Sequence, residues 1–373
     1  MRVGLVVGAR EARLKGQGSV ATSGSAKLRL GPGDEVRISG DGDRIRLDGP
    51  RGGRFDVLTF RSLNRSRFLV VNGRAYRGKV EVFARRGKVY AVNVVGLEEY
   101  LPGVVAAEMG SRPASERAAL EAQAIVSRTY ALKNRGRFKV DGYDVRAGTS
   151  DQAYLGVERE SKTAVAAVRR TRGQVLTYHG ELISPFFHST GGYSTAAPEE
   201  SFRTVSPIPY LRPVSDRKSG GGYYCDVSPR FRWTVEWDGD QLEDILRRTV
   251  PRVLHIDVAA LAGLHGVSVH TKGPSGRVTE LRLSVKSGDI PVFGPDIRAV
   301  LQTPDGTPLG STAIEVSADA ADGKIRRLRV SGAGWGHGVG MCQWGAVGRA
   351  RAGQSANTIV TTYFPGTRIE NWY

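Results

Sequence analysis

The chain has 373 residues, of which 40% are hydrophobic and 8% aromatic, and its formal net charge is +17. This length allows a well-buried core and two or three lobes, and the composition excludes wholesale disorder. The charge favours a polyanionic partner. The basic residues are dispersed in short pairs without a nucleic-acid-binding motif, so we predict no nucleic-acid partner. Arginine bias in a high-GC genome is an alternative source of the charge.

Residues 1–80 are predicted to form a β-rich N-terminal accessory lobe. Turn-forming residues at 31–34, 40–43 and 49–53 separate short strand patterns, and no constellation of reactive side chains appears among them. Strands are predicted at 27–30, 35–38, 44–47 and 68–71. Strand-like alternation continues over 79–95 around a turn at Arg86 and Gly87.

A helical segment is predicted at about 97–172. Leu97, Leu101, Val104, Val105 and Glu108 fall at i, i+4, i+7, i+8 and i+11, which places them on one helical face. Pro102 suits the first turn of a restarted helix and Gly110 suits its end. Two further helices are predicted at about 115–134 and 161–171.

Strands and loops dominate the next part, which includes a β-rich insertion at about 205–330. Strands are predicted at 174–178, 231–237, 254–258, 277–285, 290–293 and 324–330, with a short helix at 241–249. Helices near 343–352 and before Tyr363 lie within a C-terminal glycine-rich region, 331–367. The predicted fold class is α+β: β-rich, with a few short helices around a substrate cleft.

The most unusual segment is 332–346, which reads GAGWGHGVGMCQWGA. A strand this rich in glycine packs little side-chain surface and loses much backbone entropy on ordering. Such a composition usually reflects close approach of the backbone to a ligand or to another segment. His337, Trp335 and Trp344 suit a sugar ring better than a phosphate, whereas a tight core crossing is the alternative.

Four ordered motifs resemble the stage II sporulation protein D and amidase enhancer family. They are GLEEYLPGVVAAEMG at 96–110, ALEAQAIVSRTYAL at 119–132, FHSTGGYST at 187–195, and GWGHGVGMCQWGA at 334–346 followed by YFPGT at 363–367. The resemblance covers roughly three quarters of the chain. It implies that 81–373 is the catalytic region of an exported, peptidoglycan-cleaving lytic transglycosylase.

Glu108 is the predicted catalytic residue. A carboxyl group that continues an apolar stripe is costly to ionise, and a protonated carboxyl group can act as a general acid. The alternative is a helix-terminal side chain that faces water or pairs with Arg112. In the family, the glutamate at this position is the catalytic one. No clear second carboxylate is present, which suits a transglycosylase, because the muramic acid 6-hydroxyl replaces water as the nucleophile.

The remaining predicted site residues are substrate-binding. Gln123, Ser127 and Tyr130 form a polar stripe on a small-residue helix, with Arg128 beside it, and the family has Arg and Tyr at these two positions near its active site. The resemblance also predicts that a loop and the glycine-rich motif line the same cleft. These residues are His188, Ser189, Gly191, Gly192, His337 and Gln343. For Arg128, Tyr130, the 188–192 loop and His337, structural roles are the alternatives.

No metal or other cofactor is predicted. Cys225 and Cys342 lie far apart in sequence; they could pair, but nothing local forces them together, and no CxxC or His/Cys cluster is present. Some family members carry zinc through a His-Cys pair in the segment aligned with 149–154, but this chain has SDQAY at 150–154.

The predicted partner is the peptidoglycan glycan strand, in the extracytoplasmic cell envelope. The alternative function is that of a non-catalytic, peptidoglycan-binding activator of a cell-wall amidase, and a basic nucleic-acid binder is the weakest interpretation. The apolar run at 4–9 is shorter than a signal-peptide core, so we expect the leader to be absent or the start misassigned. No segment reaches transmembrane length.

Overall fold

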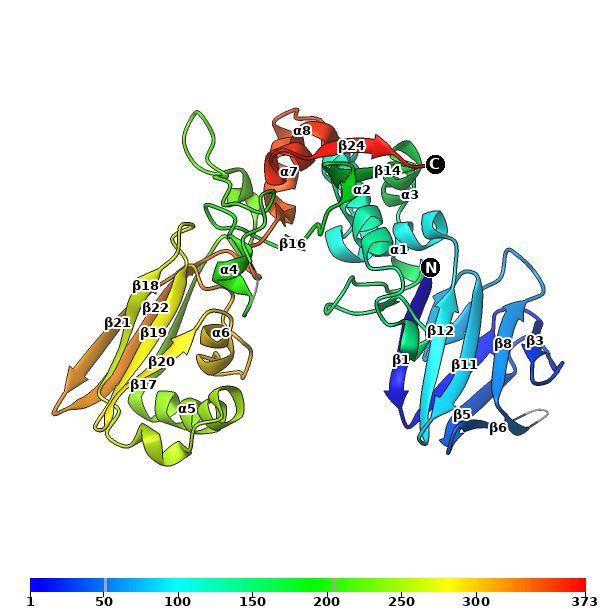
Figure 1. Ribbon diagram of the computed structural model, residues 1–373, viewed down its shortest axis with the longest axis horizontal. Coiled ribbons are helices and arrows are strands. Elements are labelled where there is room, and N and C mark those ends of the chain that lie inside the picture. Colours follow the sequence, from blue (N-terminus) through cyan, green and yellow to red (C-terminus); the bar gives the residue numbers. More distant parts are fainter. Residues whose placement is uncertain (50–51, 204–205) are drawn as a thin grey trace. The chain divides into compact units, whose positions relative to one another are not determined.

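The computed structural model describes residues 1–49, 52–203 and 206–373. Contacts divide the chain into two compact units, an N-terminal unit of Met1–Ser184 with Ile369–Tyr373, and a second unit of Pro185–Arg368. Several sheets and a smaller helical content make the fold β-rich α+β, which confirms the predicted class (Figure 1).

The N-terminal unit begins with two sheets. Strands β5 and β6 of one sheet contact β11 and β12 of the other, and alternate residues such as Val36 and Ile38 are fully buried. The larger sheet has the order β13-β1-β12-β11-β8-β3-β4, and the smaller one β10-β9-β2-β5-β6-β7. Their strands are β1 (Arg2–Ala9), β2 (Glu11–Gly16), β3 (Val20–Gly24), β4 (Arg29–Leu30), β5 (Glu35–Asp41), β6 (Arg44–Asp48), β7 (Gly53–Phe55), β8 (Val57–Ser62), β9 (Leu69–Val71), β10 (Arg74–Tyr76), β11 (Lys79–Arg85), β12 (Lys88–Val94) and β13 (Val145–Arg146).

The larger sheet continues past residue 80, because β11 pairs with both β8 and β12, and β12 pairs with β1. The predicted hairpin at 79–95 is therefore present, within a sheet that starts at the N-terminus. The assignment of an accessory role to residues 1–80 and a catalytic role to 81–373 stays a prediction. The predicted turn at 49–53 includes residues 50 and 51, which lie outside the described residues.

Helices α1 (Leu97–Met109), α2 (Arg117–Lys133) and α3 (Lys162–Arg170) pack against one another. They confirm the three predicted helices. Leu101, Val104 and Val105 of the apolar stripe are fully buried, and Gly110 ends α1 with φ 69°. The rest of this unit comprises η1 (Ala114–Glu116), η2 (Lys139–Asp141), η3 (Val157–Arg159), and a sheet of order β15-β14-β24 formed by β14 (Gln174–Tyr178), β15 (Glu181–Leu182) and β24 (Arg368–Asn371).

The second unit contains two three-stranded sheets, of order β17-β22-β21 and β18-β19-β20, which share one hydrophobic core with α5. A short parallel pair joins β16 to β23. The strands are β16 (Phe187–His188), β17 (Arg232–Asp238), β18 (Gly266–Lys272), β19 (Val278–Val285), β20 (Gly288–Phe293), β21 (Ile314–Ala321), β22 (Lys324–Ala333) and β23 (Met341–Cys342). The helices are α4 (Pro198–Ser201), η4 (Tyr224–Val227), α5 (Gly239–Leu254), η5 (Val258–Leu261), α6 (Asp296–Val300), α7 (Gln343–Arg351) and α8 (Ala356–Tyr363).

The strand predicted at 254–258 is wrong. Helix α5 continues to Leu254, and His255 then takes a left-handed conformation, φ 58°. Leu242, Leu246 and Val250 lie on one face of α5 and are fully buried. Burial of that face against the sheet outweighs the β-branched composition that favoured a strand.

Between Ala333, where β22 ends, and Met341, where β23 begins, the glycine-rich segment forms no strand. Gly334, Gly336, Gly338 and Gly340 all have positive φ, between 73° and 110°. A Cβ atom added at Gly340 would lie 2.0 Å from the Phe186 carbonyl oxygen, and one at Gly334 would lie 2.4 Å from that of Thr190. Glycine is therefore required where this segment crosses the 186–190 backbone.

Candidate functional site

Glu108 lies in the last turn of α1 and is partly buried. Its Oε1 atom accepts a hydrogen bond from the Ala153 backbone N–H at 2.7 Å. Arg112 donates to the Met109 carbonyl and pairs with Glu116 at 3.4 Å. The Ala153 hydrogen bond fixes the orientation of the Glu108 carboxyl group.

The segment 152–154, which positions this N–H group, is itself held by buried side chains. Gln152 is fully buried: its Oε1 accepts from the Tyr100 hydroxyl at 3.2 Å, and its Nε2 donates to the Ser127 carbonyl at 3.3 Å. Tyr154 packs on Tyr100 with 4.7 Å between ring centroids, and its hydroxyl donates to Asn93. Sequence reasoning missed this supporting role, because it considered the segment only for metal ligands.

Tyr130 is nearly buried, and its hydroxyl donates to Asp151 Oδ1 at 2.8 Å. Burial raises the pKa of Tyr130, and the neighbouring Asp151 carboxylate raises it further. Asp151 also accepts from Arg137 and from the Arg146 backbone N–H, each at 2.9 Å. Asp151 and the buried Gln152 thus have protein partners on both polar side-chain atoms. The segment contains neither the histidine nor the cysteine on which the expectation of zinc in the family depends.

The expected groove wall on α2 faces the protein interior instead. Gln123 and Ser127 are fully buried and hydrogen-bonded to each other at 3.0 Å. Arg128 is fully buried and forms a bidentate ion pair with Glu98, with Nε–Oε1 at 2.7 Å and Nη2–Oε2 at 2.9 Å. Its terminal nitrogens also donate to main-chain carbonyls of α2, α3 and β14. Arg128 therefore joins these elements and has no nitrogen left for a glycan.

Burial by itself would raise the pKa of Glu98. Hydrogen bonds from Arg128 and from the Tyr373 hydroxyl outweigh this effect, so that the pKa lies below its ordinary value. Glu98 is therefore ionised at neutral pH and balances the buried guanidinium charge of Arg128.

The second group of predicted residues lies in the second unit, where the structure brings the 188–192 loop against the glycine-rich segment. Thr190 and Trp335 exchange backbone hydrogen bonds, and Trp344 N–H donates to the Ser189 carbonyl at 3.0 Å. Gly191 N–H donates to the Cys342 sulfur at 3.1 Å, and the Gly192 carbonyl accepts from Arg232 at 2.9 Å. Gln343, nearly buried, begins α7.

His188 and His337 have ring centroids 5.7 Å apart. The Nδ1 atom of His188 contacts the Val339 carbonyl at 3.2 Å, and its buried Nε2 has no partner among the described residues. His337 Nδ1 accepts from the Val339 N–H at 3.1 Å. Burial lowers the pKa of His188 well below its ordinary value and that of His337 to about 4. Both rings are therefore uncharged at pH 7, and each can still donate or accept a hydrogen bond through its ring nitrogens.

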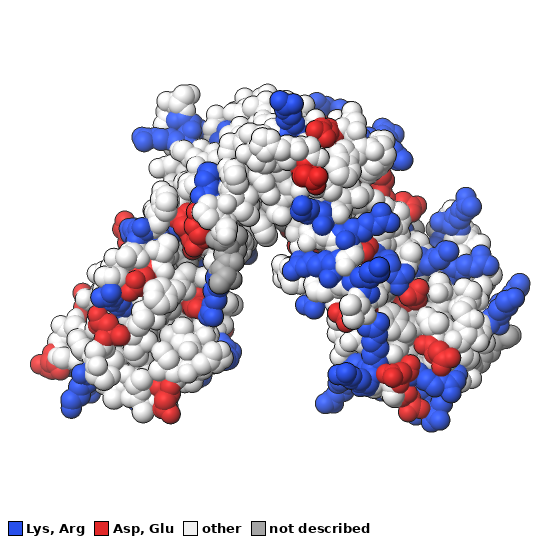
Figure 2. All heavy atoms as spheres, in the orientation of Figure 1, with Lys and Arg blue, Asp and Glu red and all other residues white. Residues whose placement is uncertain are grey.

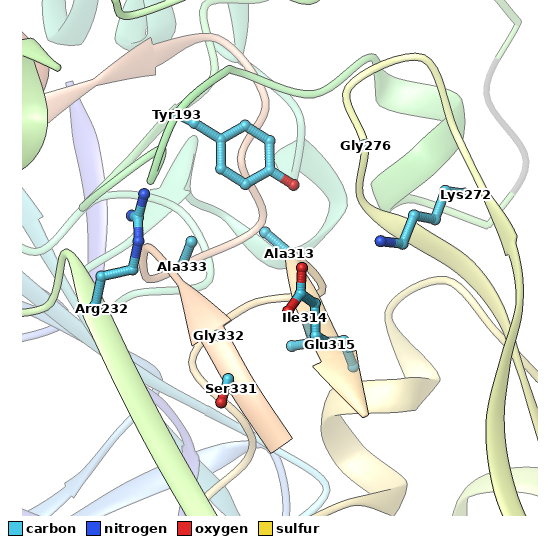
Figure 3. A pocket seen from close by; sticks show the side chains of 10 residues that line it. All are labelled: Tyr193, Arg232, Lys272, Gly276, Ala313, Ile314, Glu315, Ser331, Gly332 and Ala333. Atoms are coloured by element: carbon cyan, nitrogen blue, oxygen red, sulfur yellow. The ribbon is translucent and has the colours of Figure 1, made fainter. Parts of the chain in front are cut away.

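A pocket of about 280 Å³ opens beside this loop (Figure 3). Tyr193, Arg232, Lys272 and Glu315 line it, together with Gly332 at the start of the glycine-rich segment. These side chains offer cationic groups, a carboxylate and a hydroxyl around one space, an arrangement suited to a polar ligand.

On the face shown in Figure 2, Lys and Arg side chains are spread over the N-terminal unit with Asp and Glu among them. This distribution differs from the single basic stripe of a typical nucleic-acid-binding surface. In the parts of the chain that the structure describes, no helix is both long and apolar enough to cross a membrane.

Comparison with known proteins agrees with the motifs. A family model described as stage II sporulation protein matches residues 85–178, and one described as a domain of unknown function matches 210–340. The chain is 29% identical to an uncharacterized protein of Brachyspira hyodysenteriae over 307 residues, covering 81% of this chain and 74% of the relative. It is 28% identical to the amidase enhancer of Bacillus subtilis over 312 residues, covering 73% of this chain and 40% of the relative. It is also 30% identical to the stage II sporulation protein D of Bacillus amyloliquefaciens over 309 residues, covering 78% of each. The chain belongs to the stage II sporulation protein D family.

Proposed function

We propose that the protein is a lytic transglycosylase that remodels the bacterial cell wall, with Glu108 as its catalytic residue. The substrate is the glycan strand of peptidoglycan, and the bond broken joins N-acetylmuramic acid to N-acetylglucosamine. The site of action is the extracytoplasmic cell envelope.

A single carboxyl group carries both proton transfers in this reaction. Protonated Glu108 donates its proton to the glycosidic oxygen as the bond to the muramic acid anomeric carbon breaks. The resulting carboxylate accepts the proton of the muramic acid 6-hydroxyl, whose oxygen bonds to the same anomeric carbon. The products are a 1,6-anhydro-muramic end and a free glucosamine end, and no water is consumed.

The observation that carries this proposal is the hydrogen bond from the Ala153 N–H to the partly buried Glu108 carboxyl group. A general acid must present its proton in one direction, and a fixed carboxyl group loses little orientational freedom when the substrate binds. Surrounding Tyr100, Gln152 and Tyr154 are locked by packing and hydrogen bonds, so the N–H group that orients Glu108 is itself rigid.

Glycan binding is assigned to the loop and motif of the second unit. His188, Ser189, Gly191, Gly192, His337 and Gln343 lie on backbone segments joined by direct hydrogen bonds. The adjoining pocket adds Arg232, Lys272 and Glu315, whose charged groups match sugar hydroxyls and acidic substituents. Tyr130 and Ser127 of α2 instead bond to Asp151 and Gln152, which precede the Ala153 N–H that contacts Glu108.

The test is peptidoglycan digestion by the Glu108→Gln variant, followed by mass spectrometry of the fragments. We expect formation of anhydro-muramic ends to fall by about 10²–10⁴-fold, the usual cost of losing a general acid. Glu99→Gln is the matched control, because Glu99 lies on the same helix but is exposed; its activity should equal that of the wild type. If Glu108→Gln retains activity within about tenfold, the catalytic assignment is wrong.

A second candidate function is that of a non-catalytic activator of a cell-wall amidase, and the observation favouring it is the similarity to the protein named amidase enhancer. Under this alternative, wild-type protein produces no anhydro-muramic ends but accelerates a purified amidase on the same sacculi. Glu108→Gln would then leave the acceleration unchanged.

A further inference from the structure

Three buried side chains that can bind a metal meet in the second unit: Asp216, Cys225 and Cys342. One carboxylate oxygen and the two sulfur atoms lie within 4.8 Å of one another. Asp216 is 1% exposed and both cysteines are fully buried. Cys225 belongs to η4, whereas Cys342 precedes α7, so the cluster joins segments that are distant in sequence.

Asp216 has one satisfied oxygen and one that lacks a partner. Its Oδ1 accepts from the Tyr363 hydroxyl at 2.7 Å and from Arg349 Nη2 at 3.1 Å. Its Oδ2 is buried and has no hydrogen-bond partner among the described residues. A buried carboxylate oxygen without a partner is costly, and such an atom beside two thiols calls for a cation or donor that completes its environment.

The sulfur of Cys342 lies among backbone polar groups of two segments. It accepts the Gly191 and Gly345 backbone N–H groups, each at 3.1 Å, and caps the N-terminus of the nine-residue helix α7. The Cys342 thiol also donates to the Ser189 carbonyl at 3.8 Å, and loss of its proton on metal binding would give the thiolate, which is the form that binds metals. Backbone N–H donors to a ligating sulfur are also a typical outer-shell arrangement of metal sites.

We propose that Asp216, Cys225 and Cys342 bind one Zn²⁺ ion. Zinc prefers thiolate and carboxylate ligands at about 2.3 and 2.0–2.2 Å, which sets ligand atoms about 3.6–3.8 Å apart in a tetrahedron. The three ligand atoms lie at most about 1 Å farther apart than these distances. Water supplies the fourth ligand. Binding releases the two thiol protons to solvent, and the ion, two thiolates, Asp216 and Arg349 then sum to zero charge.

The site would be structural. It would tie the 216–225 segment to the start of α7, and through the Gly191 N–H bond to the 188–192 loop that we assign to glycan binding. Sequence alone predicts no metal here, because neither cysteine has a ligand near it in the chain. This inference rests on the cluster and not on the proposed activity, and its readouts do not use turnover.

The test is elemental analysis of the full chain purified without chelator. We expect about one zinc per chain, and two thiols that react after denaturation without reductant. Asp216→Asn and Cys342→Ser should each lower the zinc content at least about tenfold. Asp244→Asn, which removes an exposed carboxylate of α5, is the matched control and should retain the metal.

Cobalt substitution of the wild-type protein gives a second measurement that does not depend on how the variants fold. Dialysis against Co²⁺ should produce a near-ultraviolet thiolate-to-cobalt absorption that equimolar Zn²⁺ abolishes. Absence of this band overturns the proposal, as does a chain with two free thiols that binds no zinc. A Cys225–Cys342 disulfide, revealed by thiols that react only after reduction, overturns it as well.

Discussion

Replacing Arg128 by Met tests whether this residue holds the helices together or contacts the substrate. The substitution keeps most of the side-chain volume but leaves Glu98 with a 16% exposed side chain and no ion-pair partner. Removing one partner of a buried pair usually costs about 3–5 kcal/mol. Since Glu98 is not fully buried and keeps the Tyr373 hydrogen bond, we expect about 3 kcal/mol, measured by urea unfolding monitored by circular dichroism.

Two further variants separate the loss of the buried ion pair from the general effect of replacing an arginine by methionine. Arg117→Met is the same substitution on the same helix, but its ion pair with Glu121 is more exposed, so the expected loss is at most about 0.5 kcal/mol. Glu98→Gln combined with Arg128→Met removes both charges and should recover part of the lost stability. The structural role is refuted if Arg128→Met unfolds like Arg117→Met and yet loses glycan binding.

Two predictions concern the glycine-rich segment. Gly338→Val should cost at least about 2 kcal/mol in urea unfolding, because Gly338 has φ 85° and its added Cβ would lie 2.6 Å from Arg277 Nε. Gly353 has φ 81° and no atom near an added Cβ, so Gly353→Val measures only the free energy of forcing valine into this backbone conformation. Equal losses of stability in the two variants would contradict a clash between the added side chain at position 338 and Arg277. The depressed pKa of His337, about 4 against 6.5 unfolded, means that the unfolded state binds more protons between these values. Stability should therefore fall as the pH drops through this window, by about 3 kcal/mol from His337, and an unchanged pH slope in His337→Gln would contradict this assignment.

The helical region was predictable because its signals are local. The spacing of Leu101, Val104 and Val105 defines one buried face of α1, and glycine at position 110 ends the helix. The same pattern placed Glu108 on the continuation of that face. The sequence could not supply the group that orients its carboxyl, because the Ala153 N–H comes from a loop 45 residues away.

Interpretation failed where one local pattern fits two environments. The polar stripe of Gln123, Ser127 and Arg128 looks the same whether it lines a groove or satisfies buried hydrogen bonds. Only the packing of α1 and α3 against α2 decides that it is buried, since α1 supplies the carboxylate and α3 one of the carbonyls that accept from Arg128.

The sequence by itself determined the family motifs, the fold class and the main helices, because each depends on residue order or on short-range periodicity. The tertiary structure decided which distant groups meet. It brought Cys225 and Cys342 to Asp216, and it gave all four glycines of 334–340 a positive φ where the segment crosses the 186–192 loop. Periodicity fixes which side of an element is apolar, but long-range contacts depend on which segment packs against that side, and no local pattern encodes this partner.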